Sequence, residues 1–169
     1  MTYDVVSDTA DLLRKNVNEN FLPILLSDRP YNVLKGGRNS FKSSVIAIKL
    51  AYMLLRYLKA GEKANVVVIR KVANTIRDSV FLKMQWALGL FGLSDRFKAT
   101  VSPFKIQDNA TGSCIYFYGQ DDFQKLKSND IGNIIAVWYE EAAEFSSKED
   151  FDQSNVTFMR QKHDRAKFV

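Results

Sequence analysis

The chain has 169 residues, 46% of them apolar, with a net charge of +5 and an isoelectric point near 9.3. This length and composition favour one folded domain with a hydrophobic core and exclude an intrinsically disordered chain, and no apolar stretch approaches the roughly 20 residues of a membrane-spanning helix. The positive charge is compatible with a polyanionic partner, but the basic residues are scattered, so a globular domain without such a partner fits equally well.

The first half of the sequence predicts alternating helices and strands. Apolar residues at helical spacing predict three helices: residues 7–22, 43–59 and 73–88. The first is expected to open after Ser7 or Asp8 and to be followed by a loop at Pro23. Two apolar runs predict strands: residues 31–35 and 65–70. The second run is rich in valine without polar alternation, which is typical of a parallel strand buried on both faces.

The second half adds an insertion and a further strand and helix. Residues 97–118 are short strand-like runs separated by Pro103 and by a turn at residues 108–112, and they predict an antiparallel insertion. The remaining expected elements are a brief helix at 120–127, a buried strand at 133–139, a helix at 148–160 and the start of an apolar run at 166–169. Together these elements predict an α/β fold, a three-layer α-β-α sandwich whose central sheet is mostly parallel.

The lone cysteine and the lone histidine predict no chemistry. Cys114 lies in an apolar run, so it is expected to be a buried small side chain, and with no second cysteine it cannot form an internal disulfide. His163 lies between a lysine and an aspartate and is expected to be a solvated surface residue. Zinc and catalytic-triad chemistry are therefore disfavoured.

Residues 36–44 (GGRNSFKSS) nearly match the phosphate-loop pattern G-x-x-x-x-G-K-[ST]. In that pattern backbone N–H groups wrap the phosphates, the lysine reaches the outer phosphates and the hydroxyl holds magnesium. The match assigns nucleotide contacts to Gly36, Gly37, Arg38, Asn39, Ser40, Phe41, Lys42, Ser43 and Ser44. Phe41 replaces the second glycine, so its side chain must point away from the phosphates. A glycine turn followed by a helix cap is the alternative interpretation.

Two consecutive carboxylates, Glu140 and Glu141, follow the apolar run at residues 134–139. In phosphate-loop ATPases the corresponding strand lies beside the loop; its first acid helps to hold magnesium and the next activates the attacking water. We therefore expect Ser43 and Glu140 to hold Mg²⁺ and Glu141 to act as the general base. A strand that ends at a solvated helix start would carry the same residues, but the occurrence of both motifs in this order favours a nucleotide-hydrolysing site.

Four segments of this sequence resemble successive motifs of phage large terminase subunits. They are residues 31–44, 66–81, 115–128 and 136–145, and together they cover most of the chain between residues 31 and 145. The likeness lies in Gly-Gly-Arg at the head of the loop, an arginine just after the second strand, a glycine-aspartate turn followed by Lys-Leu-Lys, and the Glu-Glu pair. A double glutamate occurs in one branch of that family, whereas Phe41 departs from its usual small residue.

The resemblance implies an ATP-driven, magnesium-dependent motor in the host cytoplasm that moves double-stranded DNA into a capsid. Such a motor works as a ring of subunits with a small terminase subunit and a portal protein, and it has no membrane partner. Residues 1–169 would form one ATPase domain, truncated before the motif that couples hydrolysis to movement. The RNase H-like nuclease domain of the family is expected to be absent, so no nuclease activity is expected.

Two arginines are catalytic candidates. Arg38 lies inside the loop, where it is expected to reach the γ-phosphate or a neighbouring subunit, unless it pairs with a carboxylate such as Glu141. Arg70 ends a buried strand at the sheet edge where α/β proteins bind ligands, so it is expected to contact phosphate or to serve as an arginine finger. The sequence does not distinguish action within one subunit from action on the next.

Two other functions remain open from the sequence. A helicase-like or recombinase-like ATPase would share the phosphate loop and the acidic strand. A nucleic-acid-binding or assembly module would retain a loop that no longer hydrolyses ATP, and it would bind DNA without nucleotide.

Overall fold

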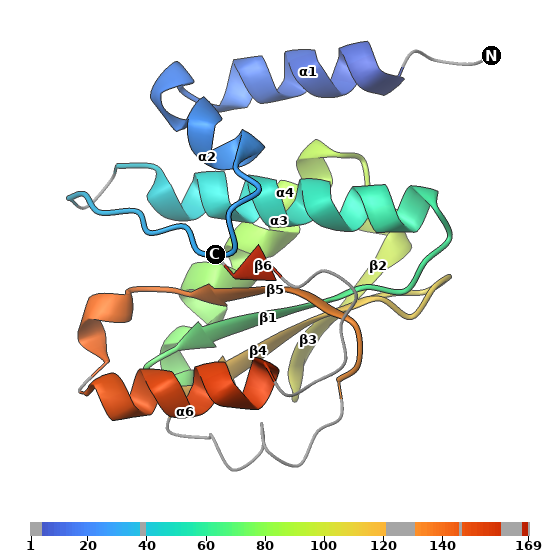
Figure 1. The fold of residues 1–169 in the computed structure, drawn as a ribbon. Helices are drawn as coiled ribbons and strands as arrows, with labels where there is room; N and C mark the ends of the chain where they lie inside the picture. Colours follow the sequence, from blue (N-terminus) through green and yellow to red (C-terminus); the bar gives the residue numbers. More distant parts are fainter. Residues whose placement is uncertain (1–4, 38–39, 121–130, 146, 160–166, 169) are drawn as a thin grey trace.

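The computed structural model of the chain, shown in Figure 1, describes residues 5–37, 40–120, 131–145, 147–159 and 167–168. Its α-helices are α1 (Val5–Asn16), α2 (Leu22–Leu26), α3 (Lys42–Lys59), α4 (Leu82–Leu90) and α6 (Lys148–Met159). Its strands are β1 (Asn65–Arg70), β2 (Phe97–Val101), β3 (Phe104–Asp108), β4 (Cys114–Gly119), β5 (Ile134–Tyr139) and β6 (Lys167–Phe168).

The six strands form one mixed sheet in the order β2-β3-β4-β1-β5-β6. Strand β1 pairs in parallel with β4 and β5, and β5 pairs in parallel with β6. Strands β2 and β3 are antiparallel, and β3 is antiparallel to β4. The expected α/β class is confirmed, but the expectation of a mostly parallel sheet is wrong. The antiparallel strands predicted for residues 97–118 are confirmed, and because β4 pairs with both β3 and β1 they extend the central sheet.

Helices cover both faces of the sheet. Figure 1 shows α3 and α4 on one side and α6 on the other. On the α3 side, Val66 and Val68 of β1 pack with Leu50 and other buried residues of α3 and α4. On the α6 side, Val67 and Ile69 pack with Phe158 of α6. Alternate residues of β1 therefore enter two different cores, which explains the valine run without polar alternation.

The N-terminal helices form a further layer on α3. A third cluster joins Val17, Val45 and Ile48, with Ile24 and Leu25 of α2 packed against it. The predicted single helix at residues 7–22 is wrong in its bounds, because α1 ends at Asn16 and Asn18 caps a new turn by accepting a hydrogen bond from Asn20 N at 3.0 Å. Pro23 lies in the first turn of α2, where its missing N–H removes no helical hydrogen bond.

A buried lysine connects this N-terminal layer to the rest of the domain. Lys49 of α3 is only 3% exposed, and its Nζ donates to Ile24 O at 2.7 Å and to Ser27 O at 2.9 Å. These carbonyls lie in the last turn of α2 and just after it. An ammonium at a helix C-terminus satisfies carbonyls that have no partner in the helix. The contact fixes the chain shortly before it enters the glycine loop.

Two other predicted elements differ in the structure. Residues 31–35 lie outside the sheet and are not a strand. Val33 is 90% exposed, whereas Leu34 is partly buried and packs against the main core without a neighbouring strand. Residues 73–88 are helical but broken: a 3₁₀ turn at Ala73–Thr75 and a π-helical turn at Arg77–Phe81 precede α4. The side chains of Arg70 and Ser79 donate hydrogen bonds to the carbonyl oxygen of Thr75, and these bonds interrupt the regular backbone hydrogen bonding of the helix.

The remaining predicted elements agree with the structure within a residue or two. Helix α3, the strands β1 and β5, the helix α6 and the turn between β3 and β4 all lie where the sequence placed them. Cys114 is buried as expected, and burial raises the pKa of its thiol to about 11. The predicted helix at 120–127 lies, except for Gln120, outside the described residues, as does His163.

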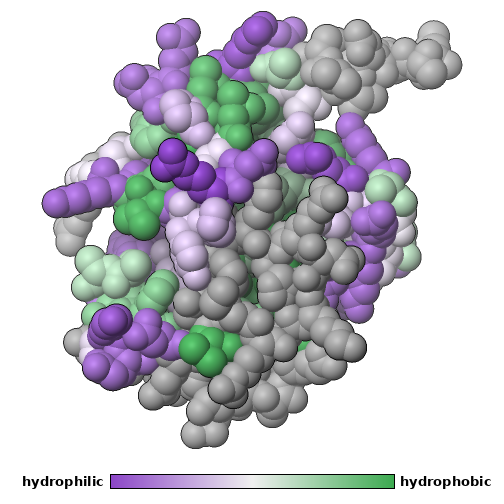
Figure 2. All heavy atoms as spheres, viewed as in Figure 1, coloured by the Kyte–Doolittle hydropathy of each residue, from purple (hydrophilic) through white to green (hydrophobic). Residues whose placement is uncertain are grey.

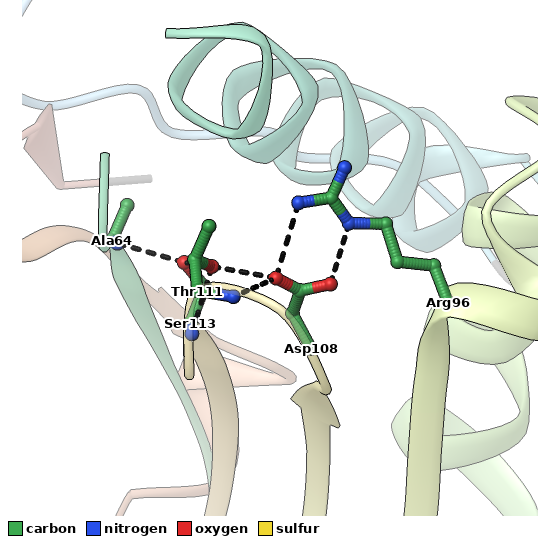
Figure 3. Close-up of polar contacts among 5 residues, drawn as sticks. All are labelled: Ala64, Arg96, Asp108, Thr111 and Ser113. Carbon is green, nitrogen blue, oxygen red and sulfur yellow. Dashed lines mark hydrogen bonds and ion pairs between the residues drawn. The ribbon is translucent and has the colours of Figure 1, made fainter. Parts of the chain in front are cut away.

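A polar network ties the β3–β4 hairpin to β1 (Figure 3). The buried carboxylate of Asp108 accepts two hydrogen bonds from Arg96, at 2.5 and 3.2 Å, and two from Thr111, both at 2.6 Å. Thr111 Oγ1 lies 2.7 Å from Ser113 Oγ, which accepts from Ala64 N at 3.0 Å. Burial raises the pKa of Asp108, but the bonds from Arg96 and Thr111 outweigh it and lower the value to about 2.

The surface of the described residues carries mixed side chains. Figure 2 shows hydrophilic side chains over much of the described part of this face, with hydrophobic ones in small separate groups. Within the described ranges, no helix combines the length and the apolar character that crossing a membrane requires.

Candidate functional site

The candidate site lies where β1 and β5 end and α3 begins. The two strands are parallel neighbours, so their carboxyl ends meet at the same edge of the sheet. The backbone ladder continues one residue beyond β5, because Glu140 N donates to Ile69 O at 2.9 Å. Glu140 therefore faces the first turn of α3, which carries the hydroxyl residues of the glycine loop, and Glu141 follows it in the chain. Residues nearly a hundred positions apart meet at this edge.

The glycine loop is closed around the ammonium of Lys42. Its Nζ donates to Gly36 O at 2.7 Å, to Gly37 O at 2.8 Å and to Ser40 Oγ at 2.7 Å. All three donors of the ammonium are therefore used by its own loop. The structure brings together Gly36, Gly37, Ser40 and Lys42, as the motif predicted, while Arg38 and Asn39 lie outside the described residues.

Phe41 adopts the backbone conformation that the missing glycine would adopt. Its φ of 59° and ψ of 7° lie in the left-handed region, and its side chain is 72% exposed. That region costs a residue with a Cβ about 1 kcal/mol or more. An exposed side chain is compatible with the prediction that Phe41 points away from bound phosphates.

Ser43 and Glu140, the two residues expected to hold magnesium, are hydrogen-bonded to each other. Ser43 Oγ donates to Glu140 Oε1 at 2.6 Å. Burial raises the pKa of Glu140, whereas the hydrogen bond from Ser43 and the positive charge of Arg70 oppose the rise. A hydroxyl and a carboxylate are hard oxygen donors, which suit Mg²⁺. No group of three His, Cys, Asp or Glu side chains that could hold a metal occurs in the described ranges, and magnesium sites at phosphates need only one or two protein oxygens.

Arg70 and Glu141 form an ion pair inside the site. Arg70 NH2 lies 3.1 Å from Glu141 Oε2, and the side chains are 12% and 52% exposed. Arg70 NH1 also donates to Ser79 Oγ at 3.0 Å and to Thr75 O at 3.3 Å. Three groups of the same chain thus meet at this guanidinium. The arrangement favours a role for Arg70 within its own subunit over reaching into a neighbour.

Glu141 has an unusual backbone and an acidic neighbour. Its φ of 54° is left-handed, and Phe41 is the other non-glycine residue with positive φ in the described ranges. Strained backbone of this kind clusters at functional sites, and both residues lie in this one. A hydrogen bond with Glu141, with smaller contributions from burial and from the Glu141 charge, raises the pKa of Glu144.

Sequence reasoning missed one cation at the site. Lys83 of α4 is half-buried, and its Nζ donates to Ser44 Oγ at 3.3 Å. It belongs to no motif, and its place within an amphipathic run gave no signal. Only the packing of α4 against α3 brings it to the loop.

A family model described as phage terminase large subunit matches residues 28–168. The chain belongs to the phage terminase large subunit family. The resemblance drawn from the sequence motifs is thereby confirmed, and the matched residues include every described member of the candidate site.

Curated relatives from this family cover most of the chain. The large terminase subunit of Bacillus phage SPP1 is 34% identical over 130 residues, which are 76% of this chain and 30% of that protein. The PBSX phage terminase large subunit of Bacillus subtilis strain 168 is 34% identical over 134 residues, 79% of this chain and 29% of that protein. The chain thus spans less than a third of the length of these terminase subunits.

Solved structures support the fold. The large terminase of a thermophilic bacteriophage, in its crystal form 2, has a TM-score of 0.64 and 16% sequence identity, covering 89% of this chain and 37% of that one. Crystal form 3 of the same protein gives a TM-score of 0.62 over 89% of this chain and 36% of that one. At this identity the likeness shows that this terminase chain shares the α/β fold.

Proposed function

We propose that this chain is the ATP-binding and ATP-hydrolysing motor domain of a phage terminase large subunit. One observation carries the proposal: Lys42 closes the glycine loop while Ser43, the next residue, meets Glu140 across the edge of the sheet. A glycine turn followed by a simple helix cap needs neither contact. A nucleotide site needs the lysine at the loop and the hydroxyl close to the carboxylate, because the phosphates and their metal bind to these groups.

The loop residues supply the phosphate contacts. The carbonyls of Gly36 and Gly37 and the hydroxyl of Ser40 hold the Lys42 ammonium in place. On ATP binding, Lys42 exchanges some of these partners for oxygens of the outer phosphates, and backbone N–H groups of residues 36–44 surround the phosphates. The left-handed backbone at Phe41 turns its side chain outward and leaves the phosphates room to approach. Arg38 and Asn39 complete this set in the proposal.

Ser43 and Glu140 would hold magnesium. When bound, Mg²⁺ neutralises the charge that develops on the phosphate oxygens during transfer. The Ser43 hydroxyl, which donates to Glu140 here, offers its lone pairs to the metal once its proton points elsewhere. Glu140 is half-buried and its carboxylate accepts a hydrogen bond from Ser43, which keeps it at this edge of the sheet.

Glu141 would activate the attacking water, and Arg70 would position the Glu141 carboxylate. Glu141 accepts a proton from the attacking water as the water oxygen bonds to the γ-phosphorus and the bond to the ADP oxygen breaks. Arg70 holds the Glu141 carboxylate at 3.1 Å, and Ser79 in turn holds Arg70. Arg38 would contact the γ-phosphate from inside the loop.

The proposed biological role is translocation of double-stranded DNA into a capsid in the host cytoplasm. The partners in this proposal are the small terminase subunit, the portal protein and further copies of the full-length subunit in a ring. Membership of the terminase family supports this role.

Calorimetric titration of magnesium–ATP tests the nucleotide site. We compare the unaltered chain with Lys42→Ala and with Lys59→Met, a control at the exposed end of the same helix. The proposal predicts binding to the unaltered chain and to the control, and loss of binding in Lys42→Ala. If the folded, unaltered chain binds no nucleotide, the proposal is wrong and DNA binding without nucleotide becomes the function to test.

Turnover provides a separate test. Glu141→Gln should keep magnesium–ATP binding within a few-fold but lower the hydrolysis rate about 100-fold or more, because general-base catalysis typically contributes factors of about 10² to 10⁴. If Glu141→Gln hydrolyses ATP at the unaltered rate, Glu141 is not the general base.

A further inference from the structure

Lys83 is the second residue of α4 and lies against the first turn of α3. It is half-buried, and its one hydrogen bond within the described ranges runs from Nζ to Ser44 Oγ at 3.3 Å. By contrast, Lys42 makes three hydrogen bonds of 2.7–2.8 Å, and Lys49 binds two carbonyls at 2.7 and 2.9 Å. Lys83 is thus the weakly partnered cation of this region.

The partner of Lys83 does not satisfy its charge. An ammonium has three donors, and Ser44 offers a neutral oxygen at a long distance. Lys83 makes no ion pair in the described ranges, although its charge is among those that oppose the burial-driven rise in the pKa of Glu140. A half-buried cation of this kind is normally paired with an anion. An anion that binds beside Ser44 could therefore pair with the Lys83 ammonium.

Positive charge from three elements converges beside Ser44. Helix α3 has 18 residues, and its N-terminal end presents unpaired N–H groups and the positive end of its dipole. Lys42 approaches from the loop, and Lys83 approaches from α4. The hydroxyl of Ser44, next to the proposed metal ligand Ser43, marks the place where Lys83 arrives. Lys42, the first residue of α3, and Lys83, beside Ser44, therefore both lie at the start of this helix.

We propose that Lys83 is a phosphate-binding residue of this site, in which its ammonium contacts a phosphate oxygen of the bound nucleotide while remaining beside Ser44. The inference rests on the proposed nucleotide site and extends it to an element, α4, that carries no part of the motif. The ligand class is a polyphosphate, because the contact requires only an anionic oxygen and involves neither the base nor the ribose.

The test compares Lys83→Met, Lys83→Arg and Lys59→Met with the unaltered chain. Calorimetry is carried out with magnesium–ATP and with magnesium tripolyphosphate, which has no base or ribose. We expect Lys83→Met to weaken binding of both ligands by about ten-fold or more, since the hydrogen bond between the ammonium and a charged phosphate oxygen is lost. Lys83→Arg should recover most of the loss, and Lys59→Met should bind normally.

Salt dependence separates a phosphate contact from a structural role. Removing one charge contact should make binding to Lys83→Met less sensitive to salt than binding to the unaltered chain, because charge pairs are screened as ionic strength rises. A purely structural role would weaken binding without changing this slope. Lys83→Gln, which keeps a polar side chain, serves as the second neutral variant if Lys83→Met does not fold.

The outcomes distinguish this inference from the proposed function. If Lys42→Ala abolishes binding while the neutral Lys83 variants bind within two-fold of the unaltered chain, the role of Lys83 is wrong and the nucleotide site stands. If the unaltered chain binds neither ligand, the nucleotide site itself is wrong. A loss confined to magnesium–ATP, with unchanged tripolyphosphate binding, also overturns the phosphate contact.

Discussion

Asp108→Asn tests the buried ion pair that joins the β3–β4 hairpin to the rest of the sheet. The Asp108 side chain is 0% exposed and accepts hydrogen bonds from Arg96 and Thr111. The amide of the variant has nearly the same shape but no charge, and its NH₂ group is a donor facing donors. We expect the free energy of unfolding at pH 7 to fall by about 2–3 kcal/mol, because a buried donor and a partly buried guanidinium lose their acceptor.

The pKa of Asp108 gives the magnitude and the sign of the pH dependence. The folded protein lowers this pKa from 3.8 to about 2. A shift of this size corresponds to about 2 kcal/mol, since one pKa unit is about 1.4 kcal/mol. Because the folded pKa lies below the unfolded one, the contribution is complete above pH 4–5 and declines as the pH falls towards 2. About half of it should remain at pH 3.

The assay is denaturant unfolding of the unaltered chain and of Asp108→Asn at several values between pH 7 and pH 3. The difference between the two unfolding free energies should be largest at pH 7 and about half as large at pH 3. Asp95→Asn, an exposed aspartate just before Arg96, is the control and should change stability by less than about 0.5 kcal/mol. A difference near zero, or one that does not change with pH, would refute the argument.

Three further predictions concern other parts of the chain. Phe41→Gly should leave the free energy of unfolding within about 1 kcal/mol of its original value or raise it. Phe41→Val should lower the free energy of unfolding by about 1 kcal/mol or more, since a β-branched residue tolerates φ of 59° poorly. Equal effects of the two variants in chemical denaturation would contradict backbone strain at Phe41. Lys49→Met should lower the free energy of unfolding by about 1–3 kcal/mol and speed trypsin cleavage after the exposed Lys35, because two carbonyls at the end of α2 lose the ammonium that binds them. An unchanged digestion pattern would argue against this anchor. The Cys114 thiol should resist alkylation at pH 8 until the protein is unfolded, because the thiol is buried and its pKa is about 11; rapid labelling of the native protein would contradict its burial.

The elements with strong local signals could be predicted from the sequence. Strands β1 and β5 are uninterrupted apolar runs, and α3 has a long helical pattern, so each is specified by its own residues. The glycine loop and the two glutamates could be predicted for a different reason. Their chemistry requires particular residue types at fixed spacing, so the two motifs together predict that the loop and the glutamates meet, even though the strand expected before the loop is not part of the sheet.

The elements that depend on neighbours could not be predicted in this way. Residues 31–35 look like a strand, but an apolar run becomes a strand only when another strand pairs with it, and the sheet does not include these residues. The helix expected at 73–88 is interrupted because Arg70, from the preceding strand, takes the carbonyl of Thr75 and the hydroxyl of Ser79. The sheet is mixed because β4 pairs with β1 in parallel and with β3 in antiparallel orientation, and no local sequence pattern indicates these two partners.

The sequence by itself determined that this chain is an α/β domain of the terminase large subunit family, with a glycine loop and an acidic strand end. Local periodicity and fixed motif spacing carry that information along the chain. Only the tertiary structure showed that the backbone of Phe41 is in the left-handed conformation, that Arg70 pairs with Glu141 and that Lys83 reaches Ser44 of the loop. Each of these depends on how separate elements pack, and packing joins residues whose distance along the chain does not reveal their distance in space.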